Sequence, residues 1–457
     1  MNEKIMTNVL LILIDSLRAD KFYGENKISI TPNIDTLIKN GSYFSQAVSS
    51  ADGTILSWSG IFTAKYPFKT GIRSSKFNKL NKTVMTYFEP FQKKGYHFYA
   101  YLPVLSETVG LFPDFENDDC FYDFFLGLSN SLGDKVIKKL KEIKDNEPWF
   151  FLIHAMDLHP PIVVPKEFDN YKFGNNYYEK KISNVDLWIG KILSHVDLDK
   201  TILVIAADHG SYVQSVSISD KQIETNPNAN LQIIVSKIAG KMPKAFQPLK
   251  EKMFFLREKM SEQKKQTMAE NINLLPHEKR ALLAGRADKD HFLFDDKIRV
   301  PLLFVGHNIP KSKIIKNQVR TVDILPTISQ LIGVELIKNT DGRSLLPLME
   351  GNTLPELPIY IESNPLVIRE SNDVIGIRTS EFKYFRDKND ATKRVHLYDL
   401  IKDPYEDNNI YEKNPQKVKE MEELLQKILK EAPKVDAQEN DENSEEIARE
   451  LRKLGYL

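Results

Sequence analysis

Cysteine is almost absent from this chain, since Cys120 is the single cysteine among 457 residues. One thiol cannot form an internal disulfide, which excludes the disulfide frameworks of small secreted domains. An excess of charge of either sign is also absent, because 63 Lys and Arg balance 63 Asp and Glu. A neutral chain creates no overall field that attracts nucleic acid or an anionic membrane. We therefore expect no nucleic-acid partner.

Long apolar runs are missing as well. The most apolar stretch near the N-terminus, Val9 to Ile14, is far shorter than the ~20 residues that a membrane-spanning helix needs. The short polar start, Met1 to Thr7, lacks the pattern of a signal peptide. We therefore expect no transmembrane segment and a cytoplasmic location. The length of the chain predicts one large domain with a smaller appendage.

Three apolar segments each end in residues that can bind metals or carry protons. The segments and the residues that end or follow them are Asn8 to Ile14 with Asp15, Trp149 to Ile153 with His154, and Thr201 to Ala207 with Asp208 and His209. Continuous apolar runs of this kind are typical of parallel strands that helices cover on both faces. Ligands of open α/β sheets gather at the carboxyl ends of the strands. We predict an α/β fold that assembles one site along this edge of the sheet.

The remaining pattern predicts how the chain is divided. Residues 1–365 are expected to form the catalytic α/β domain, 366–431 a small sheet with a helix, and 432–457 a charged tail with a closing helix. Within the first, lysine-rich residues 211–289 interrupt the alternation of strands and helices, and 246–270 have helical spacing. This insertion could be a lid, a dimer arm or a surface-binding helix pair. It could equally be a solvated helical layer.

The local elements expected around the site follow the same periodicity. Helices are predicted over residues 31–38, 83–94, 132–144, 177–196 and 414–429, and strands over 96–102, 365–384 and 395–398. A further strand is expected within 290–305, and a helix is expected to start at 321–328.

The stretch from Ser49 to Thr63 reads as a turn that runs into a helix. Asp52 and Gly53 are turn residues, and Thr54 or Asp52 can cap the helix. The first N–H groups of a helix lack partners and carry the positive end of its dipole, so a phosphate or sulfate could bind beside Thr54. We interpret Thr54 as a nucleophile. The alternative is that Thr54 serves only as an N-cap.

These motifs, in this order, resemble the sulfatase and alkaline-phosphatase superfamily, and most closely its sulfatase-fold branch. The segments that carry the resemblance are Asn8 to Asp20, Thr31 to Asp35, Thr54 to Pro67, Asp208 to Gly210, Ile298 to Pro301, Asp341 to Leu345, Leu397 to Leu400 with Asp403 and Pro404, and Leu454 to Tyr456. The resemblance covers the chain from Asn8 onward, apart from the insertion. It implies a large mixed, mostly parallel sheet sandwiched by helices, and a smaller C-terminal α+β subdomain.

Two departures from the family pattern concern the chemistry. Sulfatases carry Cys or Ser in a C-x-P-x-R motif that is oxidised to formylglycine, whereas Thr54, Leu56 and Trp58 stand at the aligned positions here. Threonine carries a methyl group on Cβ, so its oxidation would give a ketone and not an aldehyde. The paired aspartates of calcium-type sulfatases correspond to Asp15 and Ser16. In these respects the chain looks more like phosphodiesterase, phosphonate monoester hydrolase and phosphoglycerol transferase relatives.

The resemblance implies that Asp15, Thr54, Asp208 and His209 hold one divalent metal ion. Three oxygen ligands with one imidazole suit Zn²⁺ or Mn²⁺ better than Ca²⁺, because Ca²⁺ prefers larger coordination shells made only of oxygen. Ca²⁺ and Mg²⁺ are the alternatives. Such a metal would lower the pKa of the threonine hydroxyl and prepare it for attack.

Histidines supply the candidates for the remaining proton transfers. His159 and His291 are expected to bind the phosphoryl oxygens and to protonate the leaving group, although His159 could merely shape the loop at Pro160. Four further residues are candidates for supporting roles around the metal: Ser16, Arg18, His154 and Asp157. His154 could instead be a core histidine, and Arg18 and Asp157 could be salt-bridge residues.

The sequence thus predicts a metal-dependent hydrolase or transferase of phosphate or sulfate esters that works through a covalent phosphothreonine. One alternative is a sulfuric ester hydrolase without formylglycine, and another is a non-catalytic binding protein with the same fold. The ester could be a small molecule or could be linked to a glycan or a lipid. A homo-oligomer formed through the insertion is a further expectation.

Overall fold

A computed structural model describes residues 6–72, 79–123, 126–213, 215–218, 221–224, 260, 263–284, 292–363 and 373–431. His291, most of the insertion and the predicted tail at 432–457 lie outside the described residues. No described helix combines the length and the apolar character needed to cross a bilayer.

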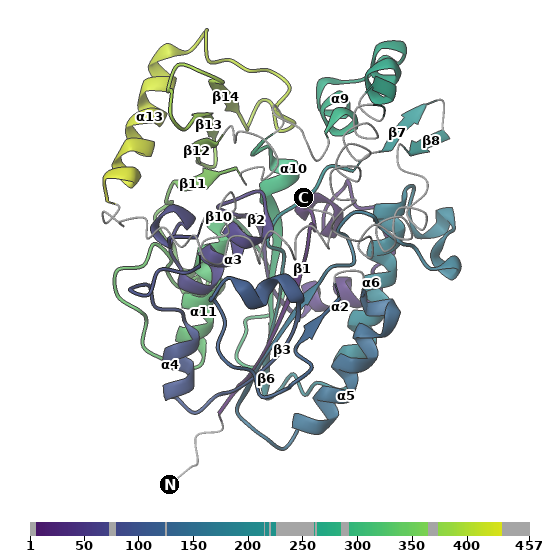
Figure 1. The fold of residues 1–457 in the computed structure, drawn as a ribbon, viewed down its shortest axis with the longest axis vertical. Helices are drawn as coiled ribbons and strands as arrows, with labels where there is room; N and C mark the ends of the chain where they lie inside the picture. The colour runs from purple at the N-terminus through teal and green to yellow at the C-terminus, as the bar shows by residue number, and fades with distance from the viewer. Residues whose placement is uncertain are drawn as a thin grey trace, which may run out of the picture.

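An eight-stranded sheet forms the centre of the molecule, in the order β10-β2-β9-β6-β1-β5-β3-β4 (Figure 1). Its strands are β1 (Asn8–Ile14), β2 (Gly41–Val48), β3 (His97–Pro103), β4 (Phe121–Tyr122), β5 (Trp149–Ala155), β6 (Thr201–Ala206), β9 (Arg299–Gly306) and β10 (Lys313–Arg320). Neighbouring strands are parallel except where β9 pairs with β2 and β6. The prediction of a mixed, mostly parallel sheet is confirmed.

Helices cover both faces of this sheet (Figure 1). One face carries α2 (Pro32–Lys39), α5 (Gly133–Ile143) and α6 (Tyr177–Leu193), and the other carries α3 (Thr54–Thr63), α4 (Phe88–Lys93) and α11 (Ile324–Leu331). The helix predicted over 83–94 is confined to α4. Proline lacks an N–H group and is tolerated only in the first turn of a helix, so Pro90 excludes a helix that begins much earlier.

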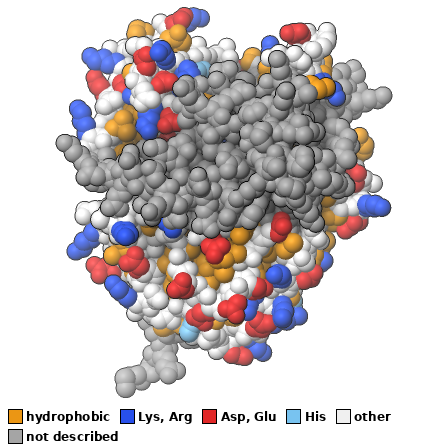
Figure 2. Space-filling view, in the orientation of Figure 1, with side chains coloured by type: hydrophobic (Ala, Val, Ile, Leu, Met, Phe, Trp, Pro, Cys, Tyr) orange, Lys and Arg blue, Asp and Glu red, His pale blue; other side chains and the backbone are white. Residues whose placement is uncertain are grey.

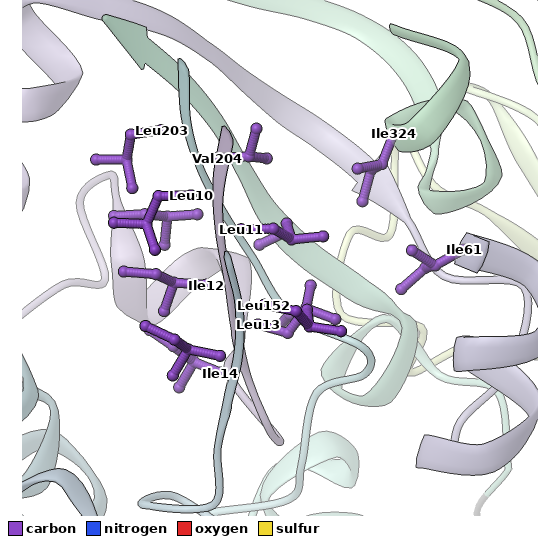
Figure 3. Packing of buried hydrophobic residues seen from close by; sticks show 14 of the residues in the cluster. Leu10, Leu11, Ile12, Leu13, Ile14, Ile61, Leu152, Leu203, Val204 and Ile324 are labelled. Atoms are coloured by element: carbon purple, nitrogen blue, oxygen red, sulfur yellow. The ribbon is translucent and has the colours of Figure 1, made fainter. Parts of the chain in front are cut away.

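The core follows from the burial of β1 on both faces. All seven residues of β1 are buried. Leu10, Ile12 and Ile14 point to one side of the sheet, whereas Leu11 and Leu13 point to the side where Ile61 of α3 and Ile324 of α11 lie (Figure 3). Burying an aliphatic side chain contributes roughly 1.5–3 kcal/mol, so the central strands are held firmly by both helical layers.

A second, four-stranded antiparallel sheet makes up the C-terminal subdomain, as predicted. It contains β11 (Ile359–Glu362), β12 (Val374–Arg378), β13 (Phe382–Asp387) and β14 (His396–Asp399), and α13 (Pro415–Lys430) packs on it. Strand β11 precedes the boundary expected at residue 365, yet it pairs with β12. Ala51 also forms a parallel bridge with Glu362, so the small sheet reaches the turn before α3.

The described part of the insertion contains a hairpin of β7 (Ser215–Ile218) and β8 (Lys221–Glu224), a helical stretch at 263–271 and α9 (Pro276–Leu283). The short helix α10 (Asp295–Ile298) follows it and precedes β9, within the segment where only a strand was expected. On the face that Figure 2 shows, acidic and basic side chains are interspersed over the described surface, in keeping with the balanced composition.

Candidate metal centre and nucleophile

Three neighbouring parallel strands bring the predicted site residues to one edge of the sheet. Strand β1 lies between β5 and β6, and Leu13 is in register with His154 on one side and Ala206 on the other. The chain therefore leaves β1 and β6 at the same level. Asp15 follows directly after β1, and Asp208 lies two residues beyond the end of β6.

Asp15, Asp208 and His209 form a compact, buried group, in which one ligand atom of each residue lies within 4.8 Å of the others. His209 Nε2 is 4.0 Å from Asp15 Oδ2 and 3.8 Å from Asp208 Oδ2. His209 Nδ1 lies 2.7 Å from the carbonyl oxygen of Gly210, which can only accept a hydrogen bond. Nδ1 therefore carries a proton, and Nε2, which faces the carboxylates, is the atom that a metal would bind once its own proton is lost.

Electrostatics also favour a cation between these groups. Burial opposes the ionisation of Asp208, but the charge of His209 and the hydrogen bond that His154 donates outweigh it and hold the pKa of Asp208 well below its usual range. Burial alone would lower the pKa of His209, yet the negative charges of Asp208 and Asp15 raise it above its usual value. A divalent cation would take the place of this proton and neutralise the carboxylates.

Thr54 faces this group from the first turn of α3. Its Oγ1 lies 3.0 Å from Asp15 Oδ2 and 3.1 Å from His209 Nε2. The expectation that Thr54 or Asp52 caps the helix is wrong, because Gly53 is the N-cap residue and no side chain caps α3. Gly53 is extended, with φ −155° and ψ 151°, which makes Thr54 the first helical residue and turns its hydroxyl toward the carboxylates.

The turn after β1 is fixed by hydrogen bonds to Ser16. Ser16 has a positive φ of 63°, its Oγ donates to Asp15 Oδ1 at 2.6 Å, and its N–H lies 3.4 Å from Asp208 Oδ1. The Tyr178 hydroxyl donates to the Ser16 carbonyl at 2.7 Å and accepts from the Arg18 N–H at 2.9 Å. These hydrogen bonds place Ser16 beside both carboxylates, and its supporting role around a metal stays a prediction.

His154 supports Asp208 from the end of β5. Its Nε2 lies 3.3 Å from Asp208 Oδ2 and 4.0 Å from Asp15 Oδ2, and the side chain is fully buried. The Trp58 ring packs against it at right angles, with ring centroids 4.7 Å apart. Its Nδ1 has no hydrogen-bond partner among the described residues, so the proton sits on Nε2 and is donated to Asp208.

The other predicted residues have different surroundings. The Arg18 guanidinium pairs with Asp20 at 2.8 Å and with Asp296, which is the salt-bridge role left open for it. Asp157 pairs with Lys181 at 2.8 Å and accepts the N–H of Leu128 at 2.9 Å. These contacts tie the loop after β5 to α6 and to the turn before α5.

The two proposed acid groups are not placed against the metal group by any described contact. His159 is half-buried, and its Nδ1 lies 2.7 Å from the carbonyl oxygen of Pro160. His291 lies outside the described residues. Their roles in proton transfer stay predictions.

Lys297 is a site residue that the sequence did not single out. It belongs to α10, its carbonyl oxygen accepts the N–H of Gly210 at 2.7 Å, and its Nζ lies 3.4 Å from Asp52 Oδ2. The only sequence signal was its place directly before the family landmark that begins at Ile298.

Comparison with known proteins identifies the family. Residues 7–334 match the sulfatase family model, and residues 285–434 match the model of the C-terminal region of N-sulphoglucosamine sulphohydrolase. Arylsulfatase K from Homo sapiens is 28% identical over 169 residues, which cover 36% of this chain and 31% of that protein. Arylsulfatase K from Mus musculus is 28% identical over 161 residues, 34% of this chain and 29% of that protein. The matched region thus spans about a third of the length of these curated relatives.

Solved structures share the fold over nearly the whole chain. A protein in complex with its substrate D-glucosamine-2-N,6-O-disulfate has a TM-score of 0.65 and 16% identity, and the match covers 96% of this chain and 100% of that one. A protein in complex with k-i-k-neocarrahexaose has a TM-score of 0.61 and 17% identity, with 98% and 97% covered. The chain belongs to the sulfatase family, within the sulfatase and alkaline-phosphatase superfamily.

Proposed function

We propose that this protein is a metal-dependent hydrolase of sulfate esters in which the Thr54 hydroxyl is the nucleophile. The observation that carries the proposal is the position of Thr54 Oγ1, 3.0 Å from Asp15 Oδ2 and 3.1 Å from His209 Nε2. Membership of the sulfatase family and the arylsulfatase relatives support sulfate over phosphate. The sugar ligands of the structural neighbours support a sulfated sugar as the class of substrate.

The donor set fits a divalent metal ion held by Asp15, Asp208 and His209, with the Thr54 oxygen as a further ligand. One imidazole among oxygen donors favours Zn²⁺ or Mn²⁺. When bound, the ion would lower the pKa of the Thr54 hydroxyl and offset the negative charge of the ester. His154 and Ser16 would hold Asp208 and Asp15 in place through their hydrogen bonds.

The chain's own residues then account for two steps. In the first, Thr54 Oγ attacks the sulfur atom, an S–O bond forms to threonine, and the S–O bond to the alcohol breaks. Thr54 loses its hydroxyl proton in this step, and the alcohol leaves with a proton, for which His159 is the proposed donor. In the second, water attacks the sulfur of the threonine sulfate ester, and sulfate and free Thr54 are released. The sum is one ester and one water converted into an alcohol and sulfate.

Phosphate-ester hydrolysis is the second candidate, and the identity of residue 54 favours it. Threonine cannot be oxidised to formylglycine, and an alcohol nucleophile with Asp and His at the metal suits the transfer of a phosphoryl group through phosphothreonine. The chemistry at Thr54 is the same in both cases, but the transferred group differs.

The test is a panel of p-nitrophenyl sulfate, p-nitrophenyl phosphate and bis-p-nitrophenyl phosphate, each with Zn²⁺, Mn²⁺, Ca²⁺ or Mg²⁺. We expect the highest kcat/KM on the sulfate ester and loss of turnover in Thr54→Ala with the fold intact. Faster turnover of a phosphate ester would favour the second candidate. No turnover together with no stoichiometric metal by elemental analysis would indicate a non-catalytic binding protein.

A further inference from the structure

The backbone of α10 is pressed against the turn that carries Asp208 and His209. The Gly210 N–H donates to the Lys297 carbonyl at 2.7 Å. A Cβ atom built on Gly210 would lie 2.2 Å from the carbonyl oxygen of Asp296 and 3.3 Å from Lys297 Cα. Lys297 is therefore fixed at its backbone beside the metal-binding turn.

The Lys297 side chain reaches from this turn to the turn that carries the nucleophile. Its Nζ lies 3.4 Å from Asp52 Oδ2, and Asp52 is two residues before Thr54. The Asp52 side chain is 2% exposed, whereas the Lys297 side chain is 26% exposed. The ammonium thus lies between the two halves of the site and can be reached by a ligand.

Lys297 uses little of its hydrogen-bonding capacity on the residues that the structure describes. Lys181, a buried lysine of α6, has an acceptor for each of its three N–H groups: Asp157 at 2.8 Å, Ser129 Oγ at 3.1 Å and Asn184 Oδ1 at 3.2 Å. Within the described part of the chain, Lys297 Nζ has Asp52 as its acceptor, at a distance too long for a good hydrogen bond. An ammonium carries three donors, so two remain for a ligand.

An anionic ester needs a positively charged side chain to bind at this site. A sulfate ester or a phosphate ester is an anion, and a divalent ion that neutralises Asp15 and Asp208 would still leave the carboxylate of Asp52 to repel it. Arg18 cannot compensate, because Asp20 and Asp296 already bind its guanidinium. Among the described residues Lys297 has one acidic partner, and its side chain is partly exposed, which leaves it able to stabilise a tetrahedral oxyanion in front of Thr54.

We infer that Lys297 binds an oxygen of the transferred sulfuryl or phosphoryl group and so selects for esters of tetrahedral oxyanions. The inference rests on the proposed function for the identity of the transferred group. The competing explanation is that Lys297 only positions the Thr54 turn through Asp52. The two explanations differ in the effect of removing Asp52. If Lys297 only positions the Thr54 turn through Asp52, loss of either residue should weaken anion binding equally. If Lys297 binds the anion itself, loss of Asp52 should not weaken anion binding.

The experiment measures binding of inorganic sulfate and of inorganic phosphate, in separate titrations, to metal-loaded protein by calorimetry. The variants are Lys297→Met, Lys297→Arg and Asp52→Asn. Lys388→Met is the matched control, since Lys388 is 32% exposed and lies 3.6 Å from Asp373 in the small sheet. Thermal unfolding confirms that each variant is folded, and kcat and KM are determined in parallel on the ester that the wild type prefers.

We expect Lys297→Met to weaken binding of the preferred anion about 10- to 100-fold, as for loss of a hydrogen bond to a charged group. Lys297→Arg should retain most of the affinity, and Asp52→Asn and Lys388→Met should not weaken it. Equal affinity in Lys297→Met and wild type, equal losses in Lys297→Met and Asp52→Asn, or a wild type that binds neither anion would overturn the inference. Because binding needs no turnover, these outcomes are separate from failure of the proposed ester hydrolysis.

Discussion

The hydroxyl of Thr54 lies 3.0 Å from Oδ2 of Asp15, although 39 positions separate the two residues in the chain. The contact joins the first turn of α3 to the end of β1, which are held together by the packing of α3 on the sheet (Figure 3). The packing of the core thus places the proposed nucleophile beside a carboxylate that is proposed to bind the metal.

Replacement of Thr54 should abolish catalysis without unfolding the protein. Thr54→Val keeps the shape of the side chain but removes the oxygen, and Thr54→Ala removes both. We expect kcat to fall at least ~10³-fold in each, as for loss of a nucleophile, and Thr54→Ser to retain measurable turnover. Steady-state kinetics with matched metal content provide the measurement, and a Thr54→Val variant as active as the wild type would contradict the mechanism.

Removal of His154 should weaken metal binding. Its Nε2 lies 3.3 Å from Asp208 Oδ2, and loss of such a supporting hydrogen bond costs about 10–100-fold in metal affinity. The variant is His154→Gln, and the affinity is measured by competition with a chromophoric chelator. Tyr122→Phe is the control, because the Tyr122 hydroxyl donates to the carbonyl of His154 and not to its ring. Equal metal affinities in His154→Gln and Tyr122→Phe would contradict the assigned role.

Metal binding should weaken as the pH falls. The pKa of His209 is raised above its usual value of 6.5, because the charges of Asp208 and Asp15 outweigh the effect of burial. Protonated Nε2 cannot bind a metal, so the affinity should drop as the pH falls through this raised pKa. Titrations between about pH 5.5 and 8.5 test the expectation, and His209→Asn should flatten the profile.

The same shift predicts the opposite trend in the metal-free protein. A group with a raised pKa in the folded state stabilises the fold fully below its unfolded pKa, and this contribution is lost as the pH rises through the folded pKa. The His209 contribution to the free energy of unfolding should therefore decrease from acidic toward neutral and alkaline pH. Denaturant unfolding of metal-free wild type and His209→Asn at each pH measures the difference.

The buried lysine of the small sheet should be essential for stability. Lys383 is fully buried, and its Nζ lies 2.6 Å from both Asp295 Oδ1 and Glu406 Oε1. Lys383→Met would leave two carboxylates without this cation and should lower the free energy of unfolding by about 3–5 kcal/mol. Lys393→Met is the control, since Lys393 is 70% exposed beside Asp390 and should cost less than ~1 kcal/mol. Urea unfolding with equal costs for both variants would contradict the prediction.

That Asp15, Asp208 and His209 come together could be predicted from sequence because the signals are local. An apolar run that ends in Asp15, and another that ends before Asp208, are visible within a few residues, and parallel register then brings the two ends together. The resemblance to a family supplied Thr54. His154 was harder to assign, because the same apolar run that predicts β5 also makes a buried histidine look like a core residue.

Lys297 and the bridge between Ala51 and Glu362 could not be predicted in this way. Lys297 contacts Asp52, and Ala51 contacts Glu362, across long distances in the chain. No local pattern in any of these segments indicates its partner. The Asp295–Ile298 segment belongs to a stretch, 290–305, that was expected to hold a strand, and its contact with Gly210 is seen only in the structure. The cap of α3 was mispredicted for a related reason: Thr54 has the right chemistry for a cap, but its hydroxyl faces the carboxylates instead.

Gly210 limits how this protein can evolve. The atom that a side chain at this position would meet belongs to the main chain of Asp296, at 2.2 Å, and a main chain cannot rotate out of the way as a side chain can. Even alanine would push α10 outward and carry Lys297 with it. Saturation mutagenesis of this codon should therefore return only glycine among active clones. Sequence changes around the site during evolution have to retain this glycine.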